Sequence, residues 1–347
     1  MGTAYKLREI FRAFETRGHY YALRKRAHRD RKRLVEKKGR SYVNNKIIKN
    51  IKEYSNSKFG STSFWPFLAL YTEIREKFIP GWIPEDYYRI NLLKKYNPDS
   101  AGLISGYKSF DNFLFENFSF PPLLYSISGN IYNRNRKMIS IREAEDILFY
   151  FGDEIIIKPE LGQGGKGIKF SYPAELSLKD LLNDGDFIIQ PVCKQHHELQ
   201  KINPNSLNTL RVFTFLEKEG NATTKFSYLK FGTGESRVDN GSAGGGICGI
   251  NMDGSLHGDF YDLSFMKRGD IHPDTGISLS NIKIPNIEGI VEACILAHES
   301  YPYVKFIGWD VAVGVDEEPI LIEWNARYPM LAYGESLFGP LWEEIPL

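Results

Sequence analysis

Two apolar segments near the end of the chain each carry one carboxylate among apolar neighbours. Residues 306–315 (FIGWDVAVGV) contain Asp310, and residues 319–324 (PILIEW) contain Glu323. An acidic turn at residues 316–318 separates the segments, so the pattern predicts a strand–turn–strand with the two carboxylates side by side. Burying a carboxylate among apolar residues costs free energy unless it is paired or binds a cation. The chain must therefore fold so that a cationic side chain or a bound cation lies beside these two carboxylates.

A third oxygen-bearing side chain belongs to the same strand. Asn325 follows Glu323 by two positions, so both side chains point to the same face. Asp, Glu and Asn supply the hard oxygen ligands that suit Mg²⁺ when it bridges nucleotide phosphates. An arginine or lysine partner would satisfy the two carboxylates equally well. Metal binding and ion pairing are therefore both open at this point.

A glycine-rich turn follows a short apolar strand that ends in lysine. Residues 154–158 (EIIIK) predict the strand, and residues 162–167 (GQGGKG) form the turn. Backbone N–H groups without side-chain hindrance can close over phosphate oxygens, while Lys158 and Lys166 reach along the phosphate chain. The spacing is neither that of a Walker A loop nor that of a dinucleotide-binding fingerprint. A purely structural hairpin turn is the alternative interpretation.

Two arginines are further candidates for the same cavity. Arg211 lies within the apolar stretch 210–215 (LRVFTF), and an arginine inside a strand needs an anion. That anion is a phosphate, a substrate carboxylate or a structural Asp. Arg327 follows Asn325 closely enough to face the same cavity.

The remaining pattern mixes hairpins and helices. Ser140 and Glu143 form a capping-box pattern at the start of a helix over residues 140–151, and residues 287–300 predict another helix. Residues 210–216 and 225–231 predict paired strands. The mixture predicts α+β lobes rather than a doubly wound parallel sheet.

The order of these motifs resembles the ATP-grasp ligases, which include D-alanine–D-alanine ligase and biotin carboxylase. More narrowly, HHELQKINPNSLNTLRVFTF, VDNGSAGGGICGI and FIGWDVAV…LIEWN are similar to segments of the sugar-transfer-associated ATP-grasp family. The resemblance extends over residues 80–335 and implies an ATP-grasp fold, in which two α+β lobes clasp ATP. Together with the helical, basic pattern of residues 1–55, it divides the chain into four segments. They are residues 1–55 (a basic helical extension), 56–140 (a substrate-side region), 141–195 (the small lobe with the glycine-rich lid) and 196–347 (the C-terminal lobe with the Mg²⁺ site).

The resemblance further implies roles for single residues. Lys108 and Lys158 correspond to two nucleotide-binding lysines, the backbone at residues 190–192 to the hinge that contacts adenine, and Glu198 or His197 to the ribose-binding position. The expected nucleotide-binding residues are Lys108, Lys158, Gly162, Gly164, Gly165, Lys166, Gln190, Pro191, Val192 and Glu198.

The resemblance also implies which residues bind the metal. Asp310, Glu323 and Asn325 match the ligands of Mg²⁺, with two ions expected. Many relatives place an arginine two residues before the metal-binding Asp, where this chain has Gly308. The expected catalytic residues that stabilise anionic charge are therefore Arg211, Lys166 and Arg327.

The resemblance implies an enzyme, an ATP-dependent carboxylate–amine ligase that forms an amide through an acyl phosphate. Its small-molecule substrates are expected to be an amine or amino acid and a carboxylate such as a sugar acid, in cell-surface polysaccharide biosynthesis. A phosphotransferase on the same scaffold and a non-catalytic nucleotide-binding module are the alternatives.

The charge distribution points to a further partner. Residues 1–40 contain 14 Lys or Arg and 4 Asp or Glu, although the whole chain has a net charge of only +1. Leu7, Ile10, Phe11 and Phe14 follow helical spacing. A basic amphipathic helix can lie on an anionic membrane surface or glycan, whereas a helix packed on the main body is the alternative. No nucleic-acid module accompanies the block, so no nucleic-acid partner is expected.

The sequence also predicts a cellular compartment. No apolar run reaches the ~18 residues of a membrane span, and the N-terminus lacks a signal-peptide pattern. Cys193, Cys248 and Cys294 are odd in number and widely spaced, which is typical of reduced cysteines rather than a disulfide framework. We therefore expect a cytoplasmic protein, associated peripherally with the inner membrane face if the basic segment binds there.

Overall fold

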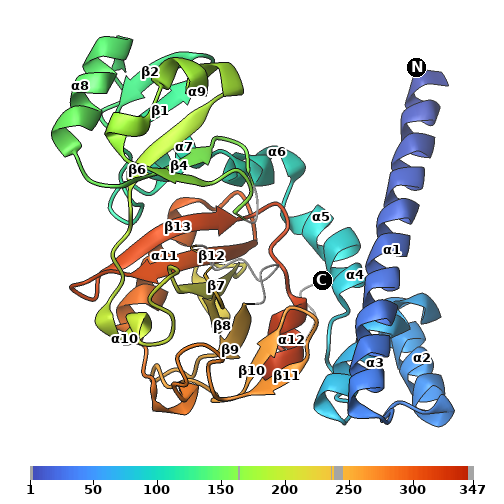
Figure 1. Ribbon diagram of the computed structural model, residues 1–347. Coiled ribbons are helices and arrows are strands. Elements are labelled where there is room, and N and C mark those ends of the chain that lie inside the picture. The colour runs from blue at the N-terminus through green and yellow to red at the C-terminus, as the bar shows by residue number, and fades with distance from the viewer. Residues whose placement is uncertain (1–2, 163–164, 236, 238–244, 343–347) are drawn as a thin grey trace. The chain divides into compact units, whose positions relative to one another are not determined.

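The computed structural model describes residues 3–162, 165–235, 237 and 245–342, and only the backbone of residues 3–17 and 19 (Figure 1). The chain forms two compact units. Unit 1 contains Met1–Pro98, Tyr261–Lys267 and Met330–Leu347, and unit 2 contains Asp99–Phe260 and Arg268–Pro329. Every described residue of the candidate site belongs to unit 2. The four-segment division expected from the sequence stays a prediction.

Unit 1 is helical. Its helices are α1 (Thr3–Lys38), α2 (Asn45–Phe59), η1 (Thr62–Phe64), α3 (Trp65–Arg75), α4 (Glu85–Tyr87), η2 (Tyr88–Leu92), α5 (Leu93–Tyr96) and α12 (Ala332–Phe338). Local signals set the ends of α2, because the Asn44 side chain accepts a hydrogen bond from the Ile47 N–H and Gly60 ends the helix with a positive φ. In the described part of α1, Leu23, Ala27 and Leu34 are buried. The stripe predicted from Leu7 to Phe14 lies outside the described side chains.

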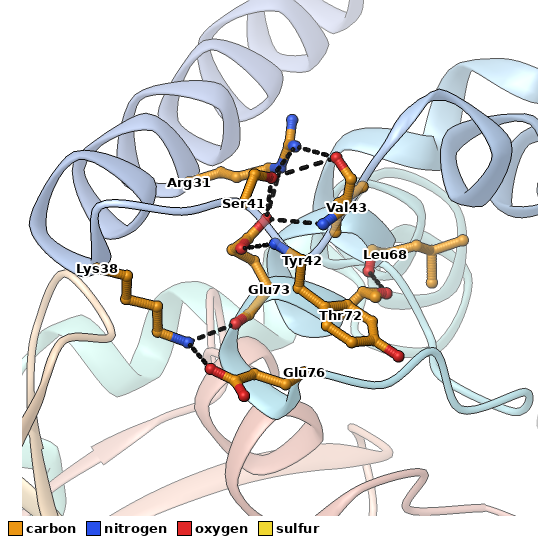
Figure 2. Close-up of polar contacts among 9 residues, drawn as sticks. All are labelled: Arg31, Lys38, Ser41, Tyr42, Val43, Leu68, Thr72, Glu73 and Glu76. Carbon is orange, nitrogen blue, oxygen red and sulfur yellow. Dashed lines mark hydrogen bonds and ion pairs between the residues drawn. The ribbon is translucent and has the colours of Figure 1, made fainter.

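The C-terminal end of α1 is fastened to α3 through Glu73, which is completely buried (Figure 2). The Glu73 carboxylate accepts hydrogen bonds from the Tyr42 N–H at 2.8 Å and the Ser41 hydroxyl at 3.0 Å, and it pairs with Arg31 at 3.3 Å. Lys38 donates to the Glu73 carbonyl and pairs with Glu76. Several basic residues of α1 thus have acidic partners within unit 1, as expected for a helix packed on the body of the protein.

The smaller sheet of unit 2 has the strand order β3-β2-β1-β6-β4-β5. Its strands are β1 (Leu124–Ile127), β2 (Asn130–Asn133), β3 (Met138–Ile139), β4 (Ile155–Pro159), β5 (Lys169–Ser171) and β6 (Phe187–Pro191). Helices α8 (Ile141–Phe151) and α9 (Leu178–Asp184) contribute to its apolar core. The Ser140 side chain and Glu143 form the predicted capping box at the start of α8.

The larger sheet has five strands in unit 2, in the order β9-β8-β7-β12-β13, and β10 and β11 continue it beyond β9. Its strands are β7 (Thr209–Leu216), β8 (Ala222–Phe231), β9 (Gly246–Gly249), β10 (Phe260–Asp262), β11 (Lys267–Gly269), β12 (Phe306–Val313) and β13 (Pro319–Asn325). The pairs β7–β8, β7–β12 and β12–β13 are antiparallel, and α11 (Ile287–Ser300) contributes to the core. Helices and two antiparallel sheets confirm the predicted α+β class.

Unit 2 also contains several short helices. They are α6 (Asp99–Gly102), η3 (Leu103–Gly106), α7 (Lys108–Leu114), η4 (Pro173–Glu175), α10 (His197–Gln200) and η6 (Leu279–Asn281). After α7 the chain runs along the edge of β13, where Phe118 O accepts a hydrogen bond from Leu321 N–H at 2.7 Å. Among the residues that the structure describes, no helix combines the length and apolar character that crossing a bilayer requires.

Candidate functional site

Asp310 on β12 and Glu323 on β13 are directly opposite each other in the strand register. This is the predicted side-by-side arrangement, and it arises because the turn at residues 314–318 joins neighbouring antiparallel strands. Burial raises the pKa of Glu323, and the charge of Asp310 raises it further. Within the described part of the chain, Glu323 makes no hydrogen bond or ion pair. Its carboxylate is therefore available to a ligand.

Asp310 has two cationic partners. Arg211 on β7 binds it in a bidentate manner, with Nε–Oδ1 and Nη2–Oδ2 distances of 2.7 and 2.9 Å. Lys230 on β8 approaches Oδ1 at 3.2 Å. Burial acts to raise the pKa of Asp310, but Arg211 and Lys230 favour the ionised form and the pKa is lowered. The ion pair that the sequence left open is thus present at Asp310.

Gly308 explains how Arg211 reaches Asp310. A Cβ atom on residue 308 would lie 2.7 Å from Arg211 Nη1 and 3.3 Å from its Cδ. The guanidinium therefore occupies the space that a side chain at position 308 would need.

Two lysines approach from the other side of the site. Lys158 is buried at the end of β4, and the Lys108 Nζ donates to the Gly162 carbonyl at 2.8 Å. Burial lowers the pKa of Lys158, as does the nearby Lys108, whereas Asp111 and Glu323 act to raise it. The Glu323 carboxylate of the larger sheet thus acts on Lys158 of the smaller sheet, and Lys108 acts to lower the pKa of Glu323. The structure brings Lys108, Lys158 and Glu323 into one site.

Sequence reasoning missed Asp111 and Lys230. Asp111 lies on α7, one turn after Lys108, and accepts a hydrogen bond from Trp324 Nε1 at 2.9 Å. Burial and the Glu323 charge raise the pKa of Asp111 well above its usual range. The i, i+3 spacing from Lys108 was the one available signal for Asp111. Lys230 stands in an apolar strand, as Arg211 does, and the same argument could have identified it.

The proposed adenine hinge ends strand β6. Gln190 is buried, and its side-chain amide donates to the Phe120 carbonyl at 2.6 Å. This side chain therefore makes a structural contact within the protein. Pro191 is the last residue of β6, and Val192 follows it. The backbone here remains the expected adenine contact.

Glu198 and Arg327, which were also expected in the site, have other partners. Glu198 pairs with Lys201 and with His197, and the Arg327 guanidinium lies 5.1 Å from the centroid of the Tyr328 ring. No contact among the described residues joins Glu198 or Arg327 to Asp310.

The glycine-rich turn is partly described. Gly165 has a positive φ of 74°, which favours glycine, and Lys166 is exposed. Gly164 lies outside the described residues.

The side chains present fit a hard divalent cation. Within the described ranges, no group of three or more His, Cys, Asp or Glu residues is arranged as a metal site, so the candidate set is two carboxylates and one amide. Asn325 Nδ2 lies 3.5 Å from the Gly308 backbone oxygen and from Asp310 Oδ2, which places its amide beside the Asp310 carboxylate. Each carboxylate oxygen has two lone-pair directions. On Asp310 Oδ1, Arg211 and Lys230 take both, which leaves one direction on Oδ2, beside the Asn325 amide, for a metal. An all-oxygen set of this kind suits Mg²⁺.

Comparisons with known proteins place the chain in a family. The sugar-transfer associated ATP-grasp family matches over residues 87–343. No protein of curated function matches the sequence. Among solved structures, the D-cycloserine synthetase DcsG has 14% sequence identity and a TM-score of 0.40, with 71% of this chain and 73% of that chain covered.

Two other solved structures have similar scores. The ATP-grasp ligase PsnB, complexed with a phosphomimetic variant of its minimal precursor, Mg and ADP, has 14% identity and a TM-score of 0.40, covering 71% of this chain and 59% of that chain. The biotin carboxylase domain of the Hydrogenobacter thermophilus 2-oxoglutarate carboxylase, in complex with MgADP, has 13% identity and a TM-score of 0.40, covering 65% of this chain. The chain covers 41% of that carboxylase chain and 59% of the PsnB chain, which is less than two thirds of each.

The family match begins before Lys108 and ends after Arg327, so it contains both sheets of unit 2 and every candidate residue described above. It confirms the ATP-grasp fold that the order of motifs predicted. The chain belongs to the sugar-transfer associated ATP-grasp family.

Proposed function

We propose that the chain is an ATP-dependent carboxylate–amine ligase that forms an amide through an acyl phosphate. One observation carries the proposal. Glu323 of the larger sheet acts to raise the pKa of Lys158 of the smaller sheet, and Lys108 acts to lower the pKa of Glu323, so cationic and acidic side chains line one site. A site for a triphosphate with Mg²⁺ needs both kinds of side chain, because lysines bind the phosphate oxygens and carboxylates bind the Mg²⁺.

Different residues of the chain bind different parts of MgATP. Lys108 and Lys158 contact phosphate oxygens, the backbone at residues 190–192 contacts adenine, and Glu198 takes the ribose. The glycine-rich turn at residues 162–167 closes over the phosphates. Glu323, Asn325 and Asp310 hold two Mg²⁺ ions, which supply positive charge where negative charge spreads over the transferred phosphoryl group.

The reaction has two steps. An oxygen of the substrate carboxylate attacks the γ-phosphorus of ATP, the bond to the β-phosphate oxygen breaks, and ADP leaves. The amine nitrogen then attacks the acyl carbon, phosphate leaves, and the nitrogen loses a proton to give the amide. Arg211 and Lys230 surround Asp310 with positive charge, and we assign Arg211, Lys166 and Arg327 to stabilising the anionic oxygens of these steps. Closure excludes water, which would otherwise hydrolyse the acyl phosphate.

The substrates we propose are an amino acid or another amine and a sugar acid, in cell-surface polysaccharide biosynthesis. The sugar-transfer association in the description of the family supports this class.

The test is ADP release from MgATP across a panel of amino acids combined with acidic sugars. The proposal expects release that requires both an amine and a carboxylate, with an amide product. The Asp310→Asn variant should lose turnover, and Glu323→Gln, which breaks no ion pair among the described residues, should lose it with the fold intact. A stable phosphorylated product formed without any amine would identify a phosphotransferase instead, and no release with any pair would favour a nucleotide-binding module.

We further propose that the N-terminal segment binds an anionic surface, either a membrane or a glycan. Lys25, Arg29, Arg33 and Lys37 recur every four residues along α1, and all four are exposed. Residues at this spacing share one face of a helix. The stripe can contact anionic lipid headgroups while the opposite face stays packed on unit 1.

Substitution tests this better than deletion, because Arg24 and Arg31 compensate the buried carboxylates of Asp86 and Glu73. A variant with Lys25, Arg33 and Lys37 changed to Gln should bind phosphatidylserine vesicles more weakly than the unchanged chain, with a smaller salt dependence. Neutral phosphatidylcholine vesicles are the control. Equal binding of both proteins to anionic vesicles would reject the membrane, and equal retention on an acidic polysaccharide would reject the glycan.

A further inference from the structure

Helix α7 is bonded to the glycine-rich turn at its N-terminal end. Lys108 Nζ donates to the Gly162 carbonyl at 2.8 Å, and the Ser109 hydroxyl donates to the Glu160 carboxylate at 2.6 Å. The Ser109 N–H also donates to Glu160, at 3.2 Å to Oε2. These contacts fix the helix that carries the first lysine to the end of strand β4.

One turn later, the same helix is bonded to the proposed metal strand. The Asp111 carboxylate accepts a hydrogen bond from Trp324 Nε1 at 2.9 Å, and Trp324 stands between the two proposed metal ligands of β13. Phe115, just after α7, packs edge-on against Trp309 and Trp324, with ring centroids 5.2 Å away in both cases. Helix α7 therefore joins the lysine side of the site to the carboxylate side.

A carboxylate is an unfavourable acceptor at this position if stability alone is considered. Asp111 is partly buried and lies near Glu323, whose charge opposes its ionisation. A neutral side chain such as Asn could accept the same hydrogen bond without this repulsion. The hydrogen bond from Trp324 thus requires the acceptor oxygen of Asp111 and not its charge.

We propose that Asp111 is a positioning residue that holds the metal strand β13 against helix α7, so that the metal ligands and Lys108 meet the same triphosphate. The inference rests on the proposed function, because it requires Mg²⁺ at β13 and nucleotide phosphate at Lys108. Without the bond, β13 can shift relative to the lysines, and small displacements in such a site weaken binding strongly.

The test measures the affinity for ADP with and without Mg²⁺ by titration calorimetry, because this needs no knowledge of the other substrates. In the unchanged chain Mg²⁺ should strengthen ADP binding. Asp111→Ala and Trp324→Phe should each lose about tenfold of the affinity for MgADP, equivalent to roughly 1.4 kcal/mol, and keep the affinity for ADP alone. Asp111→Asn retains the acceptor and should recover most of the loss. Glu116→Ala, an exposed change just after α7, is the matched control.

The outcomes distinguish failure of the positioning role of Asp111 from failure of the proposed function. If Mg²⁺ does not strengthen ADP binding by the unchanged chain, the proposed function fails. If it does, and Asp111→Ala binds MgADP as tightly as the unchanged chain, only the positioning role is overturned. Equal weakening of ADP and MgADP binding by Asp111→Ala also overturns it, since that reports general damage to the fold. An Asn variant as weak as the Ala variant overturns it as well, because the hydrogen bond would then not be the cause.

Discussion

Arg211 and Asp310 form a bidentate ion pair across neighbouring strands β7 and β12, and the guanidinium lies where a side chain on residue 308 would be. A Gly308→Ala substitution should therefore displace Arg211 and cost about 1–3 kcal/mol of the free energy of unfolding, the usual range for overpacking. MgADP affinity should fall with it. Gly106→Ala is the control, because a Cβ there meets only a Leu161 methyl at 3.9 Å. Thermal unfolding of both variants checks this, and a Gly308→Ala variant that unfolds at the same temperature as the unchanged chain would contradict it.

Replacing Arg211 by Lys should not be tolerated, although it keeps the charge. A lysine lacks the planar fork that bonds both Asp310 oxygens, and Lys230 already lies beside Oδ1. Losing charge-assisted hydrogen bonds of this kind costs about 1.5–3 kcal/mol. A double-mutant cycle with Asp310→Asn should show strong coupling in urea unfolding. Additive effects would mean that the pair contributes little.

A buried hydrogen-bond chain makes His298 sensitive to acid. Trp309 Nε1 donates to Thr214 Oγ1 at 2.8 Å, and that hydroxyl lies 2.6 Å from His298 Nδ1. His298 Nε2 lies 3.1 Å from the Val304 carbonyl, which can only accept. A neutral ring that donates from Nε2 and accepts at Nδ1 satisfies every group, whereas a protonated ring would set a second donor at Nδ1.

Burial therefore lowers the pKa of His298 from 6.5 to about 4. Between these values the unfolded chain binds the proton and the folded chain does not, so stability falls as the pH drops from 6.5 toward 4. The loss from His298 reaches about 3 kcal/mol. Above pH 6.5 the ring is neutral in both states and adds no pH dependence. Urea unfolding at several pH values should show a shallower acid decline in a His298→Gln variant, and parallel curves would contradict the account.

Removing the buried carboxylate of Glu73 should destabilise unit 1. Its carboxylate accepts from Tyr42, Ser41 and Arg31 while fully buried. Glu73→Ala leaves these donors without their acceptor, which should cost about 2–3 kcal/mol in urea unfolding. Glu76→Ala, which removes an exposed ion pair, should change little. Equal effects of the two substitutions would show that burial at Glu73 adds nothing.

Local patterns were sufficient to predict much of unit 2. The capping box at Ser140 and the placing of Asp310 opposite Glu323 both follow from spacing over a few residues. Periodicity and turn chemistry act over that range, so sequence alone carries the information.

Contacts between distant segments could not be predicted in this way. Asp111 meets Trp324 across 213 positions, and Lys230 meets Asp310 only because β8 and β12 both flank β7. Asn208, in the loop before β7, is completely buried, and its side chain and N–H donate to Gln195 Oε1, which braces that loop. Pairing at long range, rather than residue type, decides such roles.

The most direct measurement of the central claim is ADP affinity with and without Mg²⁺ for the unchanged chain and for Glu323→Gln. Glu323 has no protein partner among the described residues, so its substitution breaks no ion pair there. The account predicts that Mg²⁺ strengthens ADP binding by the unchanged chain and that Glu323→Gln loses this gain while binding ADP alone as before. An equal gain from Mg²⁺ in both proteins would contradict it.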